Sequence, residues 1–578
     1  MIFLKKNIIQ QTYSQLKKKL SAKSWKKVRL LLPISLFSNI IEILGVFLLY
    51  PIIQLILKPD LITDDSIFKT FFNSFGISNH EDAILFSFIF LFIFFVLKNG
   101  ISYIVIKKIT TLQYSIATEL VLESFDKHLN ESHSFYSKNN IAVILRNIRQ
   151  IPYEFVAFVL LPFINIINEC IVLLIALGII FLYSPVLFIS ILLFAVPTLL
   201  IYSNFFKKKL NRISSKKDKF GSDQYRIALQ ALESFVEIKV FQSRGFFIPK
   251  FTRTSLEFEN ALKESTILNT FSPKVTETVT IGSILLIVLA GRFFQIETSE
   301  LANFLILFAV GSFRILPSLN KITLSLNYIK GNKHVVKHLP DVIEKKMASF
   351  SEDEKMNFTS AISFRDLTFC YQSEGKVFEN MNFEIQKGSK IGIIGESGAG
   401  KTTFLALLLR FYKENSGGVF VDDIKLTSQN INSWYKLISY VPQSVKIIDG
   451  NLAQNIAFGI PEKNIDYDRI IDIVQKVHLH DFVEKLPKGI YSTFGENNSD
   501  ISGGQKQRIG LARALYHGGE LLILDEATSA LDVDTEKSIM TEINNLESYT
   551  VIFVTHRTGA LKGFDSIYAM ENGKLRIQ

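Results

Sequence analysis

Cysteine, tryptophan and charged residues are all scarce in this chain of 578 residues. Its two cysteines, Cys170 and Cys370, lie far apart in sequence, so we expect neither a disulfide framework nor a cysteine-based metal site. Charged residues make up 20% of the chain and hydrophobic residues 48%, with a mean hydropathy of +0.25. This balance excludes intrinsic disorder and indicates a chain that exposes apolar surface to lipid.

A basic soluble face for nucleic acid is also missing. The net charge is +10, but the lysines and arginines flank apolar segments, so no nucleic-acid partner is expected. The first 27 residues are basic and lack the apolar core and small-residue cleavage site of a removable signal peptide.

Long apolar stretches fill the first part of the chain and stop near residue 330. Each holds about 20 or more mostly apolar residues, which at ~1.5 Å per residue is enough to cross a ~30 Å hydrocarbon core. Six of them in one half of a chain argue against helices buried in a large soluble protein. The stretches are 28–57, 83–106, 155–183, 185–205, 273–295 and 301–329.

Loop charge predicts how these six spans are oriented. Residues 1–29 hold nine Lys and Arg and no acid, and residues 207–219 hold seven Lys and Arg against one Asp. Residues 58–82 carry two Lys and five acids. Because positively charged loops stay in the cytoplasm, the segments 107–150 and 206–262 and both termini are predicted to be cytoplasmic.

Both predicted cytoplasmic segments read as helix. In residues 224–241, apolar positions recur at helical spacing with no Pro or Gly between them. We expect helical hairpins near 125–140 and 225–240 to project from the membrane and to contact a soluble partner.

An outer segment, residues 64–77, carries Phe68, Phe71, Phe72 and Phe75 at helical spacing. Two aspartates at its start favour a helix N-terminus. This pattern fits an interfacial helix on the outer leaflet, and it fits equally a loop segment that packs on the spans.

The charged, apolar-poor segment 344–357 predicts a domain boundary. Beyond it, short β-rich runs alternate with helical stretches, which indicates an α/β domain with a parallel sheet. The prediction is therefore a transmembrane domain over residues 1–340 and a soluble domain over residues 341–578.

A phosphate-binding motif opens the soluble half. Residues 395–402 read GESGAGKT, which fits G-x-x-x-x-G-K-[ST], between a strand (KIGII) and a helical run. The glycines let backbone N–H groups close around phosphate oxygens, and the helix N-terminus adds positive potential. Lys401 is expected to reach the β- and γ-phosphates and Thr402 to bind Mg²⁺. The residues expected to hold the nucleotide here are Gly395, Ser397, Gly398, Gly400, Lys401, Thr402 and Thr403.

A second motif, LLILDE at 521–526, is an apolar strand that ends in two carboxylates. Asp525 suits Mg²⁺ coordination, directly or through water. Glu526, one residue later, can orient and polarise the attacking water.

These motifs together carry a family resemblance. The P-loop is followed by Pro442-Gln443, by Ser502-Gly503-Gly504-Gln505, by LLILDE and by His556. Elements in this order resemble the ATPase of ATP-binding cassette (ABC) transporters, and six spans before one cassette resemble an ABC exporter half-transporter. The segment TFGENNSD, which in the family communicates with the membrane domain, departs from the family pattern and keeps only Gly495-Glu496.

The resemblance implies a role for several residues. Tyr371 would stack on adenine, and Gln443 would sense Mg²⁺ and contact the membrane domain. Ser502, Gly503, Gly504 and Gln505 would meet the γ-phosphate of an ATP on the other protomer's P-loop. Asp532 would couple the two sites, and His556 would stabilise the transition state. The resemblance therefore implies a homodimer that holds ATP and Mg²⁺ at its interface, with Glu526, His556 and Gln443 as the catalytic residues.

Ionisable residues inside the spans indicate what is moved. Lys98, Lys274, Arg314 and Lys321 would make a cavity suited to an anionic headgroup, although Lys98 and Lys321 equally fit snorkelling near the helix ends. Glu42 is a candidate partner for one of these cations.

A narrower resemblance joins this chain to lipid-linked oligosaccharide flippases of the PglK/Wzk kind. It rests on FRILPSLNKI (313–322), on the SPK of the fifth span and on the Phe-rich outer segment. It implies a bacterial inner-membrane protein that flips a polyprenyl-pyrophosphate-linked oligosaccharide from the cytoplasmic to the outer leaflet. The alternatives are export of lipid A or another phospholipid, a drug or a peptide. A non-transporting ABC ATPase is a further rival, against which the six spans argue.

Overall fold

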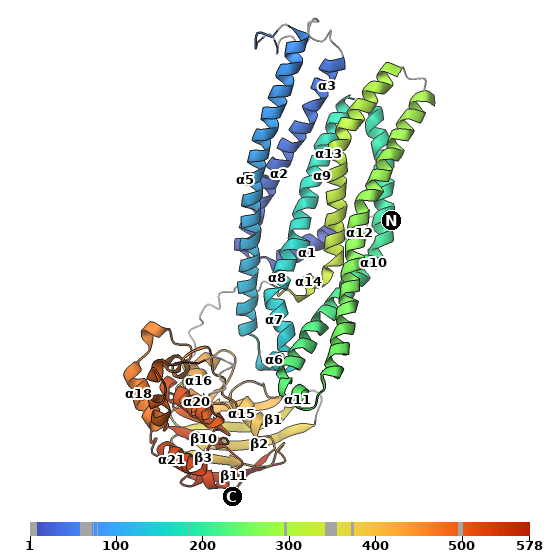
Figure 1. Cartoon of the computed structure of the whole chain (residues 1–578). Helices are drawn as coiled ribbons and strands as arrows, with labels where there is room; N and C mark the ends of the chain where they lie inside the picture. The colour runs from blue at the N-terminus through green and yellow to red at the C-terminus, as the bar shows by residue number, and fades with distance from the viewer. Residues whose placement is uncertain are drawn as a thin grey trace. The chain divides into compact units, whose positions relative to one another are not determined.

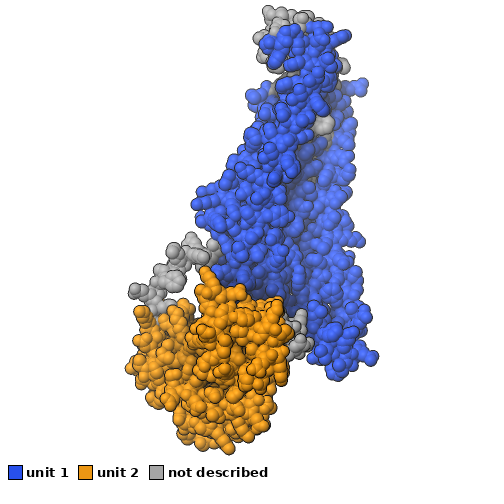
Figure 2. Space-filling view, turned by 60° about the vertical axis from the view of Figure 1, so that its left-hand side comes forward, with its two compact units in different colours: residues 1–131, 135–345 blue, residues 132–134, 346–578 orange. Residues whose placement is uncertain are grey.

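A computed structural model describes residues 8–57, 72, 74–77, 79–183, 185–293, 298–341, 355–371, 375–494 and 501–578. Contacts divide the chain into two compact units, coloured separately in Figure 2. The first unit comprises residues 1–131 and 135–345, and the second comprises residues 132–134 and 346–578. Each unit is described by itself.

Long helices dominate the first part of the chain (Figure 1). Within this unit α2 contacts α5, α9 contacts α13, and α10 contacts α12. In chain order the helices are α1 Ile8–Lys19, α2 Ala22–Phe47, α3 Leu49–Leu57, α5 His80–Leu129, α6 His133–Lys138, α7 Ile141–Arg149, α8 Ile151–Phe155, the π-helix η2 Val156–Leu160, α9 Leu161–Tyr183, α10 Pro185–Glu233, α11 Phe235–Val240, α12 Arg244–Phe293, α13 Thr298–Gly331 and α14 Lys333–His338.

Three stretches of the described residues are long and apolar enough to cross a membrane: Ala22–Gly45, His80–Leu129 and Ile151–Ile179. The helix α5 has 50 residues, so at ~1.5 Å per residue it is far longer than a ~30 Å hydrocarbon core. Its remaining length must stand outside the hydrocarbon. The helix predicted over 224–241 is confirmed, because residues 224–233 complete α10 and residues 235–240 form α11.

The surface of these helices is apolar over much of their length. Leu85, Phe92, Leu97 and Leu174 are each at least 62% exposed. A soluble monomer rarely exposes so much apolar surface. Such a surface is expected of helices that face lipid or another protomer.

An apolar core ties the basic N-terminal helix to this bundle. Leu16 of α1 packs in one buried cluster with Ile116 of α5, Phe155 of α8 and Val335 of α14, none of them more than 1% exposed. Burial of these side chains stabilises the base of the bundle, because each removes apolar surface from water.

The second unit is an α/β domain. Its strands are β1 Ala361–Cys370, β2 Lys376–Gln386, β3 Lys390–Ile394, β4 Ser416–Val421, β5 Ile424–Lys425, β6 Ile438–Val441, β7 Gly450–Asn451, β8 Thr493–Phe494, β9 Leu521–Asp525, β10 Thr550–Val554, β11 Ser566–Glu571 and β12 Lys574–Ile577. Its helices are α15 Lys401–Leu408, α16 Ile431–Lys436, α17 Leu452–Ile456, η3 Glu462–Asn464, α18 Tyr467–Lys476, α19 His480–Glu484, η4 Gly489–Tyr491, α20 Gly503–His517, α21 Val533–Asn544 and η5 Thr558–Leu561.

A six-stranded sheet has the order β12-β11-β3-β10-β9-β6. The pairings from β11 through β6 are parallel, and only β12 runs antiparallel to its neighbour. The predicted parallel sheet is therefore confirmed. A second sheet, of order β2-β1-β4-β5, is antiparallel.

Parts of three sequence features lie outside the described residues. They are most of the outer segment 64–77, most of the boundary segment 344–357, and residues 495–500 with Gly495-Glu496. Of the outer segment, Phe72 is 3% exposed and packs with Leu55 and Ala83, and the rings of Phe72 and Phe75 contact Phe86. Phe72 and Phe75 thus contact helices α3 and α5.

Candidate active site

The parallel sheet gathers the motif residues at one edge. The P-loop follows β3, His556 lies just after β10, Glu526 follows β9, and Gln443 lies just after β6. These four strands are neighbours in the sheet and run in the same direction, so their carboxyl ends meet. This is the edge at which open α/β sheets bind ligands.

The P-loop has the backbone that a phosphate cradle needs. Gly398 and Gly400 have φ angles of +85° and +109°, which side chains rarely tolerate. A Cβ on Gly395 would lie 2.6 Å from the backbone oxygen of Met570. Glycine is therefore required at these positions, and the loop can close tightly before α15 begins at Lys401.

Lys401 lies folded into its own loop. Its side chain is buried, and its Nζ donates to the backbone oxygens of Gly395 (2.6 Å) and Glu396 (2.9 Å). Burial lowers the pKa of Lys401, although the carboxylates of Glu526 and Asp525 act in the opposite direction. A cation held in a glycine cradle at a helix N-terminus fits a polyphosphate ligand.

The first turn of α15 also positions an aromatic ring. The hydroxyl of Tyr371 and the Oγ1 of Thr403 lie 2.9 Å apart in a hydrogen bond, and the Tyr371 ring meets the edge of Tyr412 at 5.5 Å between centroids. Thr402, by contrast, is exposed, as is Ser397. Their hydroxyls are accessible to a phosphate-bound cation or to phosphate oxygens.

The three predicted catalytic residues meet at one carboxylate. Glu526 Oε2 accepts a hydrogen bond of 2.7 Å from Gln443 Nε2, and Glu526 Oε1 lies 2.7 Å from His556 Nε2. Glu526 has a φ of +50°, an uncommon backbone for a residue with a side chain. Strain of this kind is characteristic of functional positions.

Asp525 ends β9, next to Glu526. Burial and the neighbouring Glu526 raise the pKa of the Asp525 carboxyl, and Tyr440 donates to it at 3.4 Å. Among the described residues no group of three His, Cys, Asp or Glu side chains forms a metal site by itself. Thr402, Gln443 and Asp525 are oxygen donors of the kind that Mg²⁺ prefers, and they fit a Mg²⁺ ion that also takes ligands from phosphate.

The Ser502-to-Gln505 element begins helix α20. Ser502 is its N-cap, and Ser502 and Gln505 exchange hydrogen bonds between side chain and backbone as a capping box. A Cβ on Gly504 would lie 3.1 Å from the backbone oxygen of Ala530, so the glycine allows α20 to approach that segment. Asp532 caps α21 and accepts from the backbone N–H of Thr535 at 3.0 Å, a contact that lowers the Asp532 pKa.

Gln507 is a site residue that the motifs did not single out. Its Nε2 donates to the backbone oxygen of Glu526 (3.2 Å) and to Ser529 (2.9 Å), and its Oε1 accepts from the N–H of Ala530 (2.9 Å). This side chain joins α20 to the segment that holds Glu526. Its place two residues after Gln505 was the signal that could have found it.

Two of the four cations predicted to face a substrate lie beside carboxylates. Lys321 Nζ lies 2.9 Å from Glu169, and Lys274 Nζ lies 3.0 Å from Glu277. Each of these two lysines therefore has a carboxylate beside it, and the sequence analysis did not identify Glu169 or Glu277.

The other two predicted cations are Lys98 and Arg314. Lys98 lies over the ring of Phe95, 4.4 Å from its centroid, and its stem approaches Gly45 of α2. Arg314 belongs to α13, and its side chain lies outside the described residues.

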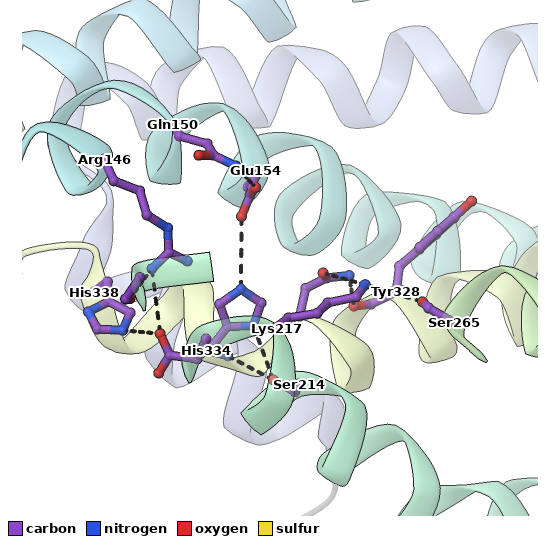
Figure 3. Close-up of polar contacts among 12 residues, drawn as sticks. Arg146, Gln150, Glu154, Ser214, Lys217, Ser265, Tyr328, His334 and His338 are labelled. Carbon is purple, nitrogen blue, oxygen red and sulfur yellow. Dashed lines mark hydrogen bonds and ion pairs between the residues drawn. The ribbon is translucent and has the colours of Figure 1, made fainter. Parts of the chain in front are cut away.

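A second polar cluster joins α7, α8, α10 and α14 (Figure 3). Asp218 contacts His338 at 2.6 Å and Arg146 at 3.7 Å. Ser214 Oγ lies 3.2 Å from His334 Nδ1, while His334 Nε2 lies 3.9 Å from Glu154. Side chains brought together from sequence positions so far apart cannot be found by motif, and the sequence analysis missed them.

Lys217 continues this cluster toward α12. Its Nζ donates to Ser265 Oγ (3.2 Å) and to Asn332 Oδ1 (3.4 Å), as Figure 3 illustrates. Burial lowers the pKa of Lys217, and it lowers the pKa of His334 to about 4 despite the opposing charge of Asp218. The cluster thus joins α7, α8, α10, α12 and α14 through mostly buried polar groups.

Comparison with known families defines the class. Residues 34–315 match the ABC transporter transmembrane region, and residues 378–529 match the ABC transporter family. The chain is 30% identical over 408 residues to a Rickettsia bellii relative whose name contains "export ATP-binding/permease protein", covering 67% of this chain and 68% of that one. The chain belongs to the ABC transporter family.

One further relative and one solved structure define the fold more closely. An ATP-dependent lipid A-core flippase of Legionella pneumophila (strain Paris) is 29% identical over 387 residues, which span 66% of this chain and 65% of that relative's length. The solved structure of a bacterial Atm1-family ABC exporter with ATP bound superposes with a TM-score of 0.76 at 18% identity, over 96% of this chain and 95% of that chain. The predicted fold, an ABC exporter transmembrane domain fused to an ABC nucleotide-binding domain, is confirmed.

Proposed function

We propose that this protein is an ATP-driven flippase for a lipid with an anionic headgroup. The observation that carries the ATP-driven part is the meeting of Gln443, Glu526 and His556 at the sheet edge beside the P-loop. The lipid part is supported by exposed apolar helices and by relatives named as lipid A-core flippases.

The substrate that we propose is a polyprenyl-pyrophosphate-linked oligosaccharide, moved from the cytoplasmic to the outer leaflet. Its pyrophosphate would be met by Lys321, Lys274, Arg314 and Lys98. A lipid A-type substrate also presents phosphate groups on an apolar anchor, and it fits about equally. Lysine is a compact point charge that binds phosphate without the bidentate geometry of arginine, so these lysines suit either headgroup.

Residues of the second unit divide the ATPase work. Lys401 and the P-loop N–H groups would bind the β- and γ-phosphates, with Tyr371 against the base. Glu526 would orient and polarise the attacking water, while His556 would stabilise charge on the γ-phosphate. A bound Mg²⁺, held by Thr402, Asp525 and Gln443, would neutralise phosphate charge.

A homodimer completes this site in our proposal. Ser502, Gly503, Gly504 and Gln505 lie at the N-terminus of α20, which favours an anion. They would meet the γ-phosphate bound by the partner's P-loop, with Asp532 coupling the two sites. The short helices α6 and α11 would transmit closure of the nucleotide sites to the membrane helices.

The membrane topology follows the same proposal. Six spans, with domain limits of 1–340 and 341–578, would place both termini in the cytoplasm of a bacterial inner membrane. The basic residues of α1 and of 207–219 support this orientation.

ATPase activity in nanodiscs tests the substrate class. Polyprenyl-pyrophosphate oligosaccharide, lipid A and a neutral lipid would be added in turn, and stimulation by the first at lower concentration than by the second would support the oligosaccharide. Stimulation by lipid A alone would assign the alternative. Full ATPase activity from a particle with the mass of one protomer would contradict the dimer.

A further inference from the structure

A buried carboxylate lies inside the third apolar span. Glu169 belongs to α9, and its side chain is only 3% exposed. One carboxylate oxygen lies 2.9 Å from Lys321 Nζ, and the other accepts a hydrogen bond of 2.7 Å from Ser318 Oγ, both on α13. An ionisable side chain inside a membrane-spanning helix is costly, so its presence points to function.

Ser318 and Lys321 differ in how freely their side chains can move. Ser318 is fully buried and holds Glu169 in place, and the preceding residue, Asn168, donates to Ser35 of α2. The Lys321 side chain is 46% exposed and has a long flexible stem. Lys321 can therefore turn toward an incoming anion, whereas Glu169 stays where it is.

A second lysine–carboxylate pair provides a natural comparison. Lys274 and Glu277 face each other at 3.0 Å along α12, with side chains 70% and 58% exposed. Thr276 of α12 and Asn320 of α13 are hydrogen bonded, so the two pairs lie at neighbouring levels of adjacent helices. An exposed pair is weakly held, because water screens it and both side chains lose freedom. The buried Glu169 binds its lysine more firmly.

We propose that Glu169 is a positioning residue that sets headgroup selectivity through Lys321. An anion that approaches Lys321 must compete with a carboxylate that cannot follow the lysine outward. The attraction between charges scales with their product, so a headgroup with several phosphate charges competes far better than a monoanionic one. This inference rests on the proposed flippase function and adds to it the exclusion of ordinary monoanionic phospholipids.

The substitution Glu169→Gln tests this role. Glutamine keeps the shape and can accept from Ser318, but it removes the charge that competes for Lys321. In nanodiscs, the half-stimulating concentration of phosphatidylglycerol for ATPase activity should fall by about tenfold, with basal and maximal rates unchanged. That of polyprenyl pyrophosphate should change little, so the discrimination between the two lipids shrinks. The matched control, Glu277→Gln, should leave both concentrations unchanged.

The outcomes distinguish failure of the role proposed for Glu169 from failure of the flippase function on which that role rests. A wild-type protein that discriminates between the lipids and a Glu169→Gln variant that discriminates equally well would overturn the role of Glu169 alone. A wild-type protein stimulated by neither of these lipids nor by lipid A would overturn the flippase function, and this inference with it.

Two further variants keep the test decisive. If Glu169→Gln does not fold, Ser318→Ala takes its place, because it removes the hydrogen bond that holds the carboxylate. It should lower the half-stimulating concentration of phosphatidylglycerol by a smaller factor. Adding Lys321→Gln to Glu169→Gln should abolish this gain in sensitivity to phosphatidylglycerol. A gain that survives the loss of Lys321 would contradict the proposed route.

Discussion

Glu526 Oε1 lies 2.7 Å from His556 Nε2, and the other Glu526 oxygen is bonded to Gln443. The residues come from three adjacent parallel strands, so the sheet fixes their spacing. Both carboxylate oxygens are occupied by side chains, which makes Glu526 the centre of the site.

Replacing Glu526 by Gln separates binding from hydrolysis. The amide keeps the shape of the side chain but cannot act as a general base, a role worth ~10²–10⁴-fold in rate. ATPase activity should fall by at least about a hundredfold, while binding of a fluorescent ATP analogue should remain. A variant that hydrolyses ATP at half the wild-type rate would remove Glu526 from the mechanism.

Lys401→Ala should act earlier in the cycle. It removes the buried ammonium that would meet the phosphates, and a charge-assisted contact of this kind contributes ~1.5–3 kcal/mol. Affinity for the ATP analogue should therefore fall by at least about tenfold, as measured by equilibrium titration. Unaltered affinity would show that the P-loop lysine does not contact the nucleotide.

Gln507→Ala should impair the link between α20 and the Glu526 segment. Its loss leaves the N–H of Ala530 without this acceptor, and a typical hydrogen bond contributes ~0.5–1.5 kcal/mol. We expect ATPase activity to fall about tenfold with the affinity for ATP little changed. The exposed Gln475→Ala on α18 is the control, and an equal loss in both variants would argue against a specific role for Gln507.

His334 predicts acid lability of the bundle. Its pKa is lowered to about 4 by burial, against 6.5 for an exposed histidine. Between these values the unfolded chain binds a proton that the folded chain does not, so stability falls as the pH falls from 6.5 to 4. The full loss is about 3 kcal/mol.

Thermal unfolding in detergent at pH 7.5 and pH 5 measures this effect. The Asn of His334→Asn can still contact Ser214 in place of Nδ1, and it does not titrate. The variant should lose less stability than the wild type on acidification. An equal loss in both proteins would assign the acid sensitivity to other groups.

Some residues of the nucleotide site can be predicted from the sequence and others cannot. The P-loop, Glu526 and His556 are predictable because each follows an apolar strand, and parallel strands bring their carboxyl ends together. Gln507 and Tyr440 are not, because their contacts depend on how α20 and β6 pack on β9.

The membrane unit shows the same limit more sharply. Lys321 is conspicuous in sequence, but its partner Glu169 lies about 150 residues earlier, and only the packing of α9 on α13 joins them. A single acid in the apolar stretch 155–183 was the available signal. Likewise, His338 and Asp218 meet only because α10 packs against α14.

Lipid flipping in proteoliposomes tests the central claim most directly. Fluorescent polyprenyl-pyrophosphate oligosaccharide, lipid A and a neutral phospholipid would be compared, with the Glu526→Gln protein as the inactive control. The account predicts ATP-dependent movement of an anionic lipid, foremost the oligosaccharide, that disappears with Glu526→Gln. Vigorous ATP hydrolysis with no lipid moving faster than in the control would contradict it.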